Sequence, residues 1–303
     1  MVTLIQPSGA QVVQVTGIEV KQRTDGVEVI LIKNWYGEVA ATHTSEQIKN
    51  WYGEVADAYN KTRPRYPQEL IYRAVEVAQL PADAIILEVG CGPGIATVPF
   101  AQLGFSIICL EPSQNAYQIA KQNCASYPSV EITNTTFEEW KLETERFHAV
   151  LAANAWHWVP PEIGYLKAAA ALQENGFLIL LWNMTPQPSY EVYQALNEVY
   201  QLQAPSLVRY EDRLTQERIL SGIGQNVIDS GQFKNLVSEQ LACEITYTID
   251  DYLTLLSTLS PYMMLEPQRR NALFEGLQEV LEGSCLRSIQ VSYLSAFQIA
   301  QKV

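Results

Sequence analysis

The stretch Ile86–Gly94, with the sequence ILEVGCGPG, decides the fold of this chain. It continues a short apolar run that begins at Ala84, and glycines follow at Gly90, Gly92 and Gly94. An apolar run of this length that ends at glycines is typical of a strand buried in a parallel sheet. Glycine lets the backbone turn tightly and approach a ligand, and a helix that follows offers free N–H groups. The stretch therefore predicts a strand, a ligand-binding turn and a helix in succession.

The following residues repeat this alternation of strand and helix. Apolar runs predict four further strands, at residues 106–110, 130–133, 149–153 and 177–182. Helices are predicted between them at about 95–103, 114–125 and 162–174, and Gly104 and Gly176 stand where two of these helices should end. Five strands joined by helices predict a doubly wound parallel sheet, because parallel strands need crossover connections. Later runs at 241–248 and 286–299 could complete the sheet.

A carboxylate at the end of the second predicted strand supports a ligand site next to the glycine turn. Glu111 ends the run SIICLE, 17 positions after Gly94. A carboxylate at that place can accept both hydroxyls of a ribose, and the alternative is a solvated carboxylate at a strand end. The spacing G-x-G-x-G departs from the dinucleotide fingerprint, which requires a glycine at the position of Ile95.

Composition limits the class of protein. The 303 residues suggest about two domains at roughly 150 residues each, and a hydrophobic fraction of 48% indicates a globular chain. The net charge of −13 disfavours nucleic acid and anionic membrane as partners, because both would repel the surface. No apolar run of ~18 residues and no export signal is seen. The five cysteines show neither metal spacing nor a disulfide pattern, so we expect a cytoplasmic protein without a metal.

Six segments give the chain its resemblance to the class I S-adenosylmethionine-dependent methyltransferases, over about residues 50–185. They are YNKTRPRYP (59–67), ILEVGCGPG (86–94), LEPS (110–113), TTFEEW (135–140), FHAVLAANAWHWV (147–159) and LQENGFLILLWN (172–183). The first segment resembles the small-molecule branch that includes trans-aconitate methyltransferase-like proteins. The resemblance implies an α/β, Rossmann-like, doubly wound and mostly parallel seven-stranded sheet, with helices on both faces and a helical cap.

The same resemblance assigns S-adenosylmethionine as the cofactor and gives roles to residues. The glycine turn and Glu88 would surround the methionine moiety, Glu111 would hold the ribose, and Phe137 would flank the adenine. Tyr59 and Arg63 would lie near the charged amino-acid end. The expected cofactor residues are Tyr59, Arg63, Glu88, Gly90, Cys91, Gly92, Gly94, Glu111, Pro112, Phe137, Glu138, Asn154 and Trp156.

The sequence says less about which residues contact the methyl acceptor than about those that bind the cofactor. Methyl transfer is a direct displacement, so the protein must chiefly align the reactants and exclude water. His157 could remove a proton from a hydroxyl acceptor, or it could simply pack in the loop. Trp158 and Tyr262 could contact the acceptor, and Arg209 could bind a carboxylate on it. Ordinary packing and a solvated charge are the alternatives for these three residues.

The N-terminal residues differ from the rest. Residues 11–32 alternate β-branched residues around Asp25-Gly26, which predicts a β-hairpin. The nonapeptide IKNWYGEVA occurs at 32–40 and again at 48–56, which indicates a local duplication. We expect residues 1–47 to be a leader without a function of its own, and 48–303 to be the methyltransferase domain. Within this domain, 48–183 form the cofactor-binding core, 184–285 the cap and late core elements, and 286–303 the final strand.

The sequence thus predicts an enzyme that transfers a methyl group to a hydroxyl, carboxylate or similar group of a small molecule. One alternative is a protein that binds S-adenosylmethionine or S-adenosylhomocysteine without catalysis. The other is a nucleotide-dependent oxidoreductase, which Ile95 disfavours. The oligomeric state is not predicted.

Overall fold

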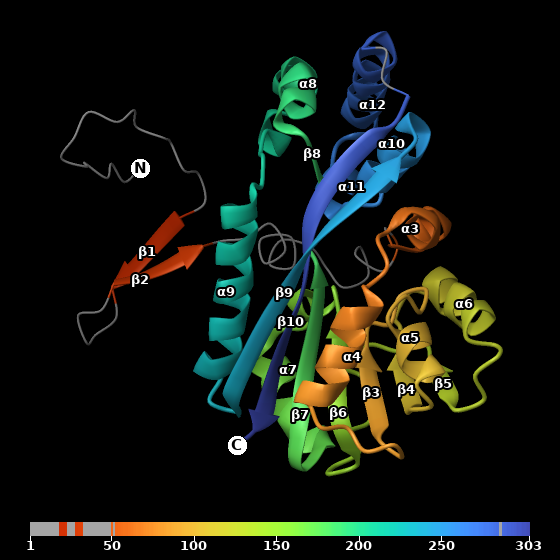
Figure 1. Cartoon of the computed structure of the whole chain (residues 1–303), viewed down its shortest axis with the longest axis vertical. Coiled ribbons are helices and arrows are strands. Elements are labelled where there is room, and N and C mark those ends of the chain that lie inside the picture. Colours follow the sequence, from red (N-terminus) through yellow and green to blue (C-terminus); the bar gives the residue numbers. More distant parts are fainter. Residues whose placement is uncertain (1–17, 23–27, 33–49, 51, 285–286) are drawn as a thin grey trace.

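A computed structural model describes residues 18–22, 28–32, 50, 52–284 and 287–303 of the chain (Figure 1). The strands of its main sheet are β3 (Ile85–Val89), β4 (Ser106–Leu110), β5 (Val130–Thr133), β6 (Phe147–Ala153), β7 (Leu172–Asn183), β8 (Gln187–Pro188), β9 (Phe233–Tyr247) and β10 (Ile289–Lys302). They follow the order β5-β4-β3-β6-β7-β10-β8, with β9 also paired to β10. β3 to β7 run parallel, and β10 is antiparallel to its neighbours.

The predicted doubly wound α/β sheet is confirmed in this part of the chain. The seven expected strands are β3 to β7, β9 and β10, and the two-residue β8 is added to them. β9 begins eight residues before the run that predicted it, and β10 is shifted by three residues toward the C-terminus.

Helices cover both faces of the sheet (Figure 1). α4 (Gln68–Val77), α5 (Thr97–Gln102) and α6 (Gln114–Asn123) pack on one face, and α7 (Pro161–Ala171) and α9 (Arg213–Asp229) pack on the other. Within β3, Ile86 belongs to the apolar cluster of the first face and its neighbour Leu87 to that of the second, and neither is exposed. A strand buried on both faces needs apolar residues in succession, which explains the run that begins at Ala84.

A helical cap lies above the sheet in Figure 1. It contains α8 (Tyr190–Gln203), η2 (Pro205–Leu207), α10 (Ile249–Ser257), α11 (Ser260–Met263) and α12 (Pro267–Gly283). Leu255, Leu273 and Leu277 are fully buried in its apolar cluster. Ile289 and Val291 of β10 belong to the same cluster, so the last strand runs through both the cap and the sheet.

The prediction that a helix ends near Gly176 is wrong. α7 ends at Ala171, and Gly176 lies inside β7. The pairing between β6 and β7 shifts here, from Phe147 with Leu172 to Ala149 with Phe177. A Cβ atom on Gly176 would lie 3.1 Å from the carbonyl oxygen of His148, so glycine serves close packing at this irregularity. Gly104 has the expected left-handed conformation after α5, with φ of 91°.

The N-terminal hairpin is described only by its strands, β1 (Ile18–Gln22) and β2 (Glu28–Ile32), which pair antiparallel as predicted. The expected Asp25-Gly26 turn and residues 33–40 of the first nonapeptide copy lie outside the described residues. The second copy leads into α3 (Ala56–Thr62).

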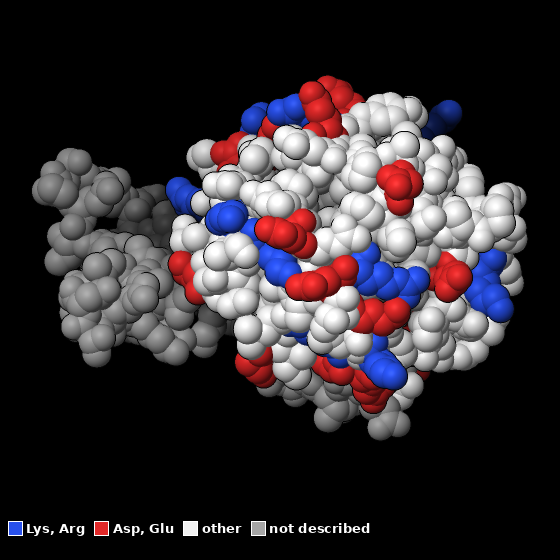
Figure 2. Space-filling view, turned by 90° about the horizontal axis from the view of Figure 1, so that it is seen from below, with Lys and Arg blue, Asp and Glu red and all other residues white. Residues whose placement is uncertain are grey.

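Charged side chains are interspersed on the molecular face seen in Figure 2. Acidic and basic groups alternate along the same band of this face. This view therefore shows no continuous basic surface on that side of the molecule.

Candidate functional site

The glycine turn after β3 has a backbone that only glycine adopts easily. Gly90, Gly92 and Gly94 have φ values of 66°, 56° and 86°. A Cβ atom on Gly90 would lie 2.8 Å from the Cβ atom of Ala155, whereas one on Gly92 would meet nothing within 4 Å. Gly90 therefore permits close packing, and Gly92 leaves the space in front of the turn open.

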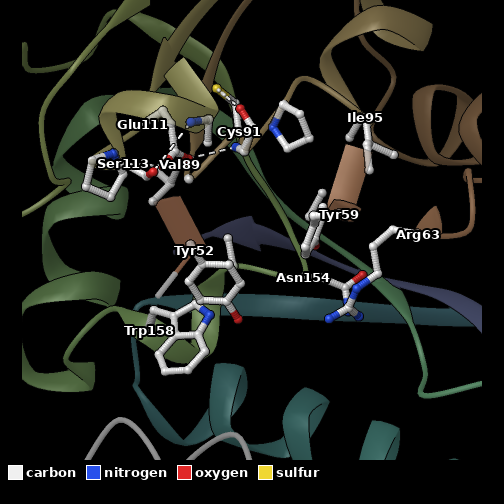
Figure 3. Close-up of a pocket in the computed structure, with 18 of the residues that line it drawn as sticks. Tyr52, Tyr59, Arg63, Val89, Cys91, Ile95, Glu111, Ser113, Asn154 and Trp158 are labelled. Atoms are coloured by element: carbon white, nitrogen blue, oxygen red, sulfur yellow. Dashed lines mark hydrogen bonds between the residues drawn. The ribbon is translucent and has the colours of Figure 1, made fainter. Parts of the chain in front are cut away.

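Glu111 connects this turn to the end of β4 (Figure 3). Its Oε2 accepts a hydrogen bond from the Gly92 N–H at 2.8 Å, and its Oε1 accepts one from the Ser113 N–H at 2.7 Å. Burial raises the pKa of the Glu111 carboxyl to about 7, against the lowering effect of the two N–H groups. Since each carboxylate oxygen has two lone pairs, both oxygens keep capacity for a further donor, such as a hydroxyl.

Glu88 lies behind the turn. Its Oε2 accepts a hydrogen bond from the Thr97 hydroxyl at 2.7 Å, and its Oε1 has no hydrogen-bond partner. The residue is fully buried, and this burial raises the pKa of its carboxyl to about 7. Neither Glu88 nor Gly94 lines the cavity in front of the turn.

A cavity of about 160 Å³ opens in front of the turn, at the carboxyl ends of β3, β6 and β7. Ten of the thirteen residues expected at the cofactor line it. They are Tyr59, Arg63, Gly90, Cys91, Gly92, Glu111, Pro112, Phe137, Glu138 and Asn154. Trp156, like Glu88 and Gly94, does not line the cavity. Its ring packs against Phe137 and Tyr165 instead, at centroid distances of 6.1 and 5.4 Å.

Sequence reasoning missed other residues of this cavity, among them Tyr52, Ser113, Asn183 and Met184. Tyr52 comes from the second copy of the nonapeptide, and its ring lies 5.7 Å from that of Trp158 (Figure 3). Ser113 ends the LEPS segment and caps α6, where its hydroxyl oxygen accepts a hydrogen bond from the Ala116 N–H. The serine that follows Glu111 and Pro112 was a signal that could have identified it.

Asn154 fixes the segment after α3 against the sheet. It has a left-handed φ of 51°, which asparagine tolerates. Its Oδ1 accepts hydrogen bonds from the Tyr66 hydroxyl at 2.6 Å and the Asn183 N–H at 2.8 Å. Asn183 in turn donates through Nδ2 to the carbonyl oxygen of Pro64 at 2.9 Å. These bonds position the segment 59–67 at the ends of β6 and β7.

Arg63 joins this segment to the cap. Its Nε donates to the Thr258 hydroxyl at 2.9 Å, and its Nη2 donates to the Thr258 carbonyl oxygen at 2.8 Å. The guanidinium lies 4.6 Å from the centre of the Tyr59 ring. Within the described chain no carboxylate forms an ion pair with Arg63. A positive charge therefore stands between the core and the cap.

A second cavity, of about 100 Å³, adjoins the first. The two share Tyr52, Tyr59, Arg63, Asn154 and Pro186, and cap residues line most of the rest of the second cavity. Of the residues expected at the acceptor, His157, Arg209 and Tyr262 line the second cavity and Trp158 lines the first. This arrangement could hold two ligands next to each other.

The burial and the partners of the polar side chains in the second cavity differ from what the sequence predicted. Both ring nitrogens of His157 are inaccessible to solvent, and burial, with a smaller contribution from Arg63, lowers the pKa of its imidazole to about 3. The hydroxyls of Tyr262 and Tyr200 are 2.7 Å apart. Arg209 is partly exposed and has an ion-pair partner: its Nε lies 3.1 Å from Oε1 of Glu211, a residue that sequence reasoning missed.

Two further searches of the described residues gave negative results. No group of three or more His, Cys, Asp or Glu side chains in the described ranges is arranged to hold a metal ion. No helix within those ranges combines the length and the hydropathy that a membrane-spanning helix needs.

Comparisons with known proteins agree with this geometry. Residues 86–176 match the family described as "Methyltransferase domain". The chain is 33% identical over 127 residues to an uncharacterized methyltransferase of Mycobacterium bovis, an alignment that covers 42% of this chain and 49% of the relative. It is 29% identical over 130 residues to a ubiquinone biosynthesis O-methyltransferase of Methylocella silvestris, with 40% and 51% covered. The chain thus spans about half the length of the curated relatives it matches.

A solved structure from Anaeromyxobacter dehalogenans, provisionally described as a type II methyltransferase, has the same fold. Its TM-score is 0.56 at 20% identity, and the superposition covers 79% of this chain and 97% of that one. The matched residues 86–176 include four of the six segments in full. Over this part the chain is similar to methyltransferases, and its sheet has the fold of a solved structure described as one.

Proposed function

We propose that this chain transfers a methyl group from S-adenosylmethionine to a small molecule bound in the second cavity. The observation that carries the proposal is that the two cavities share five lining residues. Direct displacement requires the methyl donor and the acceptor to be in contact and in line, without water between them. Two adjoining cavities of different composition meet that requirement.

The residues of the first cavity are suited to S-adenosylmethionine. The two oxygens of Glu111 have capacity left for the ribose hydroxyls, and the open side of Gly92 lets a ligand approach the backbone. When bound, the cofactor would supply an electrophilic methyl group. The chain's own contribution is to hold the cofactor, to orient the acceptor and to exclude water from the space between them. The roles of Glu88, Gly94 and Trp156 at the cofactor stay predictions.

We propose an oxygen atom as the methyl acceptor. Several relatives are O-methyltransferases by name, and six tyrosines are among the residues that line the second cavity. His157 borders that cavity as a neutral imidazole, because with a pKa of about 3 it does not bind a second ring proton at physiological pH. That pKa makes it a weak base, and its role as the catalytic base stays a prediction.

The proposed partner is therefore a small molecule rather than nucleic acid, and the proposed location is the cytoplasm. The net charge of −13 and the interspersed charges in Figure 2 favour the first statement. The second is favoured by Cys91, Cys109, Cys124 and Cys243, which are free thiols.

Calorimetric titration with S-adenosylhomocysteine tests the first cavity. We expect Gly92→Arg to block binding, because its side chain enters the cavity, and Glu111→Ala to weaken binding at least tenfold, because each hydrogen bond to a carboxylate contributes about 1.5–3 kcal/mol. The matched controls are Gly231→Arg, at a glycine with φ of 69° and open space around it, and Glu131→Ala. Unchanged affinity in both cavity variants would refute the assignment.

Transfer of a labelled methyl group into a metabolite extract tests the activity. A labelled product supports the proposal, whereas tight binding of S-adenosylhomocysteine without any product would favour the non-catalytic alternative. Titration with a nicotinamide dinucleotide in the same calorimeter tests the oxidoreductase alternative.

A further inference from the structure

Glu211 places a buried carboxylate in the wall of the second cavity. Its side chain is 9% exposed, and its Oε1 lies 3.1 Å from Arg209 Nε. Its Oε2 is inaccessible to solvent and has no hydrogen-bond partner. A buried carboxylate oxygen without a donor is costly, so a donor is expected to reach it when the cavity is filled.

The backbone around Glu211 is held in place. Gln216 donates through Nε2 to the carbonyl oxygens of Glu211 and Thr185, at 3.4 and 3.1 Å. Its Oε1 accepts a hydrogen bond from the Leu294 N–H of β10 at 2.9 Å. Asp212 caps α9 by accepting from the Thr215 N–H at 2.8 Å. The backbone that carries the Glu211 side chain is therefore attached to the sheet.

The charges around the cavity act against two classes of ligand. Glu211 and Arg209 form one ion pair, and Arg63 adds a cation that has no carboxylate partner among the described residues. A cationic ligand would approach two guanidinium groups, and an anionic ligand would approach the Glu211 carboxylate that has no donor. A neutral O–H or N–H group can donate a hydrogen bond to Oε2 without either repulsion.

The remaining wall suits an apolar ring. Aromatic and leucine side chains line most of it, namely Tyr52, Tyr59, Tyr193, Tyr200, Tyr252, Tyr262, Leu196, Leu207, Leu256 and Leu259. The Tyr200 and Tyr262 hydroxyls form a hydrogen bond with each other. They therefore compete only weakly with Glu211 for the polar group of the ligand. Burial of a ring against such a wall supplies affinity, and the polar group supplies orientation.

We propose that Glu211 is the residue that selects the methyl acceptor, and that its Oε2 accepts a hydrogen bond from a neutral O–H or N–H donor on an apolar, ring-bearing small molecule. This inference rests on the proposed function, because it concerns the acceptor of that reaction. Glu211 acts here as a binding and positioning residue, and no proton transfer is assigned to it.

The test uses the full chain saturated with S-adenosylhomocysteine and four probes of matched shape. The probes are 4-methylphenol, toluene, 4-methylbenzoate and 4-methylbenzylammonium, and their dissociation constants are measured by saturation-transfer NMR titration. We expect 4-methylphenol to bind at least threefold more tightly than each of the other three. A smaller ratio against any of them would overturn the inference.

Two variants test the residue itself. In Glu211→Gln the amide oxygen is expected to turn to Arg209, which leaves an NH₂ donor facing the ligand's donor. The preference for 4-methylphenol over toluene should then fall at least threefold. The matched control is Glu217→Gln, which changes the more exposed ion pair of Glu217 with Arg213 at 2.9 Å and should leave the preference unchanged. A preserved preference in Glu211→Gln, or an equal loss in the control, contradicts the inference.

Separate readouts keep the two proposals apart. If Glu211→Gln does not fold, as judged by far-ultraviolet circular dichroism, the ranking of probes on the unmodified chain decides the question. If the unmodified chain binds S-adenosylhomocysteine but shows no ranking, only the role of Glu211 is refuted. If it does not bind S-adenosylhomocysteine, the proposed function itself fails.

Discussion

Replacement of Glu88 by glutamine should change how the stability of the protein depends on pH. The Glu88 side chain is fully buried, and its pKa is raised from an ordinary value of 4.5 to about 7, mainly by burial. A carboxyl group whose pKa is higher in the folded state binds its proton more tightly there. Folding is therefore opposed as the pH rises above 4.5, and the full cost is present above pH 7.

The size of this cost follows from the two pKa values. Their difference corresponds to about 3 kcal/mol, since a tenfold change in a proton-binding constant is worth about 1.4 kcal/mol. Glutamine keeps an oxygen that can accept from the Thr97 hydroxyl and cannot titrate. The difference in unfolding free energy between Glu88→Gln and the unmodified protein should therefore shift in favour of the variant by about 2–3 kcal/mol between pH 5 and pH 8.

Urea unfolding of the cofactor-free protein, followed by tryptophan fluorescence at four pH values from 5 to 8, measures this difference. If the amide group also changes the unfolding free energy by an amount that does not depend on pH, the difference between the two proteins is offset equally at every pH. The variation of that difference with pH then stays the same. Glu139→Gln, at an exposed carboxyl, is the control and should give a difference that does not vary with pH. A flat curve for Glu88→Gln would refute the reasoning from burial.

Three other substitutions test the packing of the cap and its attachment to the core. Leu255→Ala removes a fully buried side chain of the cap cluster and should lower the unfolding free energy by about 2–5 kcal/mol in urea unfolding; a loss below 1 kcal/mol would contradict the burial. Gln216→Leu leaves the buried Leu294 N–H without an acceptor and should cost about 1–3 kcal/mol, whereas an unchanged midpoint would count against the contact. Arg63→Lys loses the two-atom contact with Thr258, so amide hydrogen exchange of α10 should become faster, and equal rates would show that the contact does not hold the cap.

The strands and the glycine turn of the core could be predicted because each sequence pattern there has one local physical cause. A strand buried on both faces requires an uninterrupted apolar run, and the left-handed turn after Val89 requires glycines. Glu111 could be expected at the site because the carboxyl ends of parallel strands meet at one edge of a sheet. The error at Gly176 arose because glycine is used both to end helices and to allow close packing, and the sequence does not distinguish these uses.

The second cavity could be predicted only in part, because distant segments form it. Arg209 was expected to be solvated or to bind a carboxylate of the acceptor, whereas it pairs with Glu211, two positions away, whose burial the sequence did not predict. His157 was expected either to act as a base or to pack in the loop, and the sequence did not predict the burial that lowers the pKa of its imidazole to about 3. Charge and titration depend on the surroundings of a side chain, and these surroundings come from tertiary packing.

The placement of β10 has a consequence for the order in which the chain folds. β10 lies between β7 and β9, and β9 joins the sheet only through it in the described structure. During synthesis, β3 to β7 and then β9 emerge before β10, so β9 has no neighbouring strand until Ile289–Lys302 has been made. Pairing of β7 with β10 also joins Phe177 to Gln301, a contact between residues far apart in sequence, which forms slowly. Completion of the sheet is therefore a late folding step, and until it occurs β7 and β9 each present an unpaired edge to other chains.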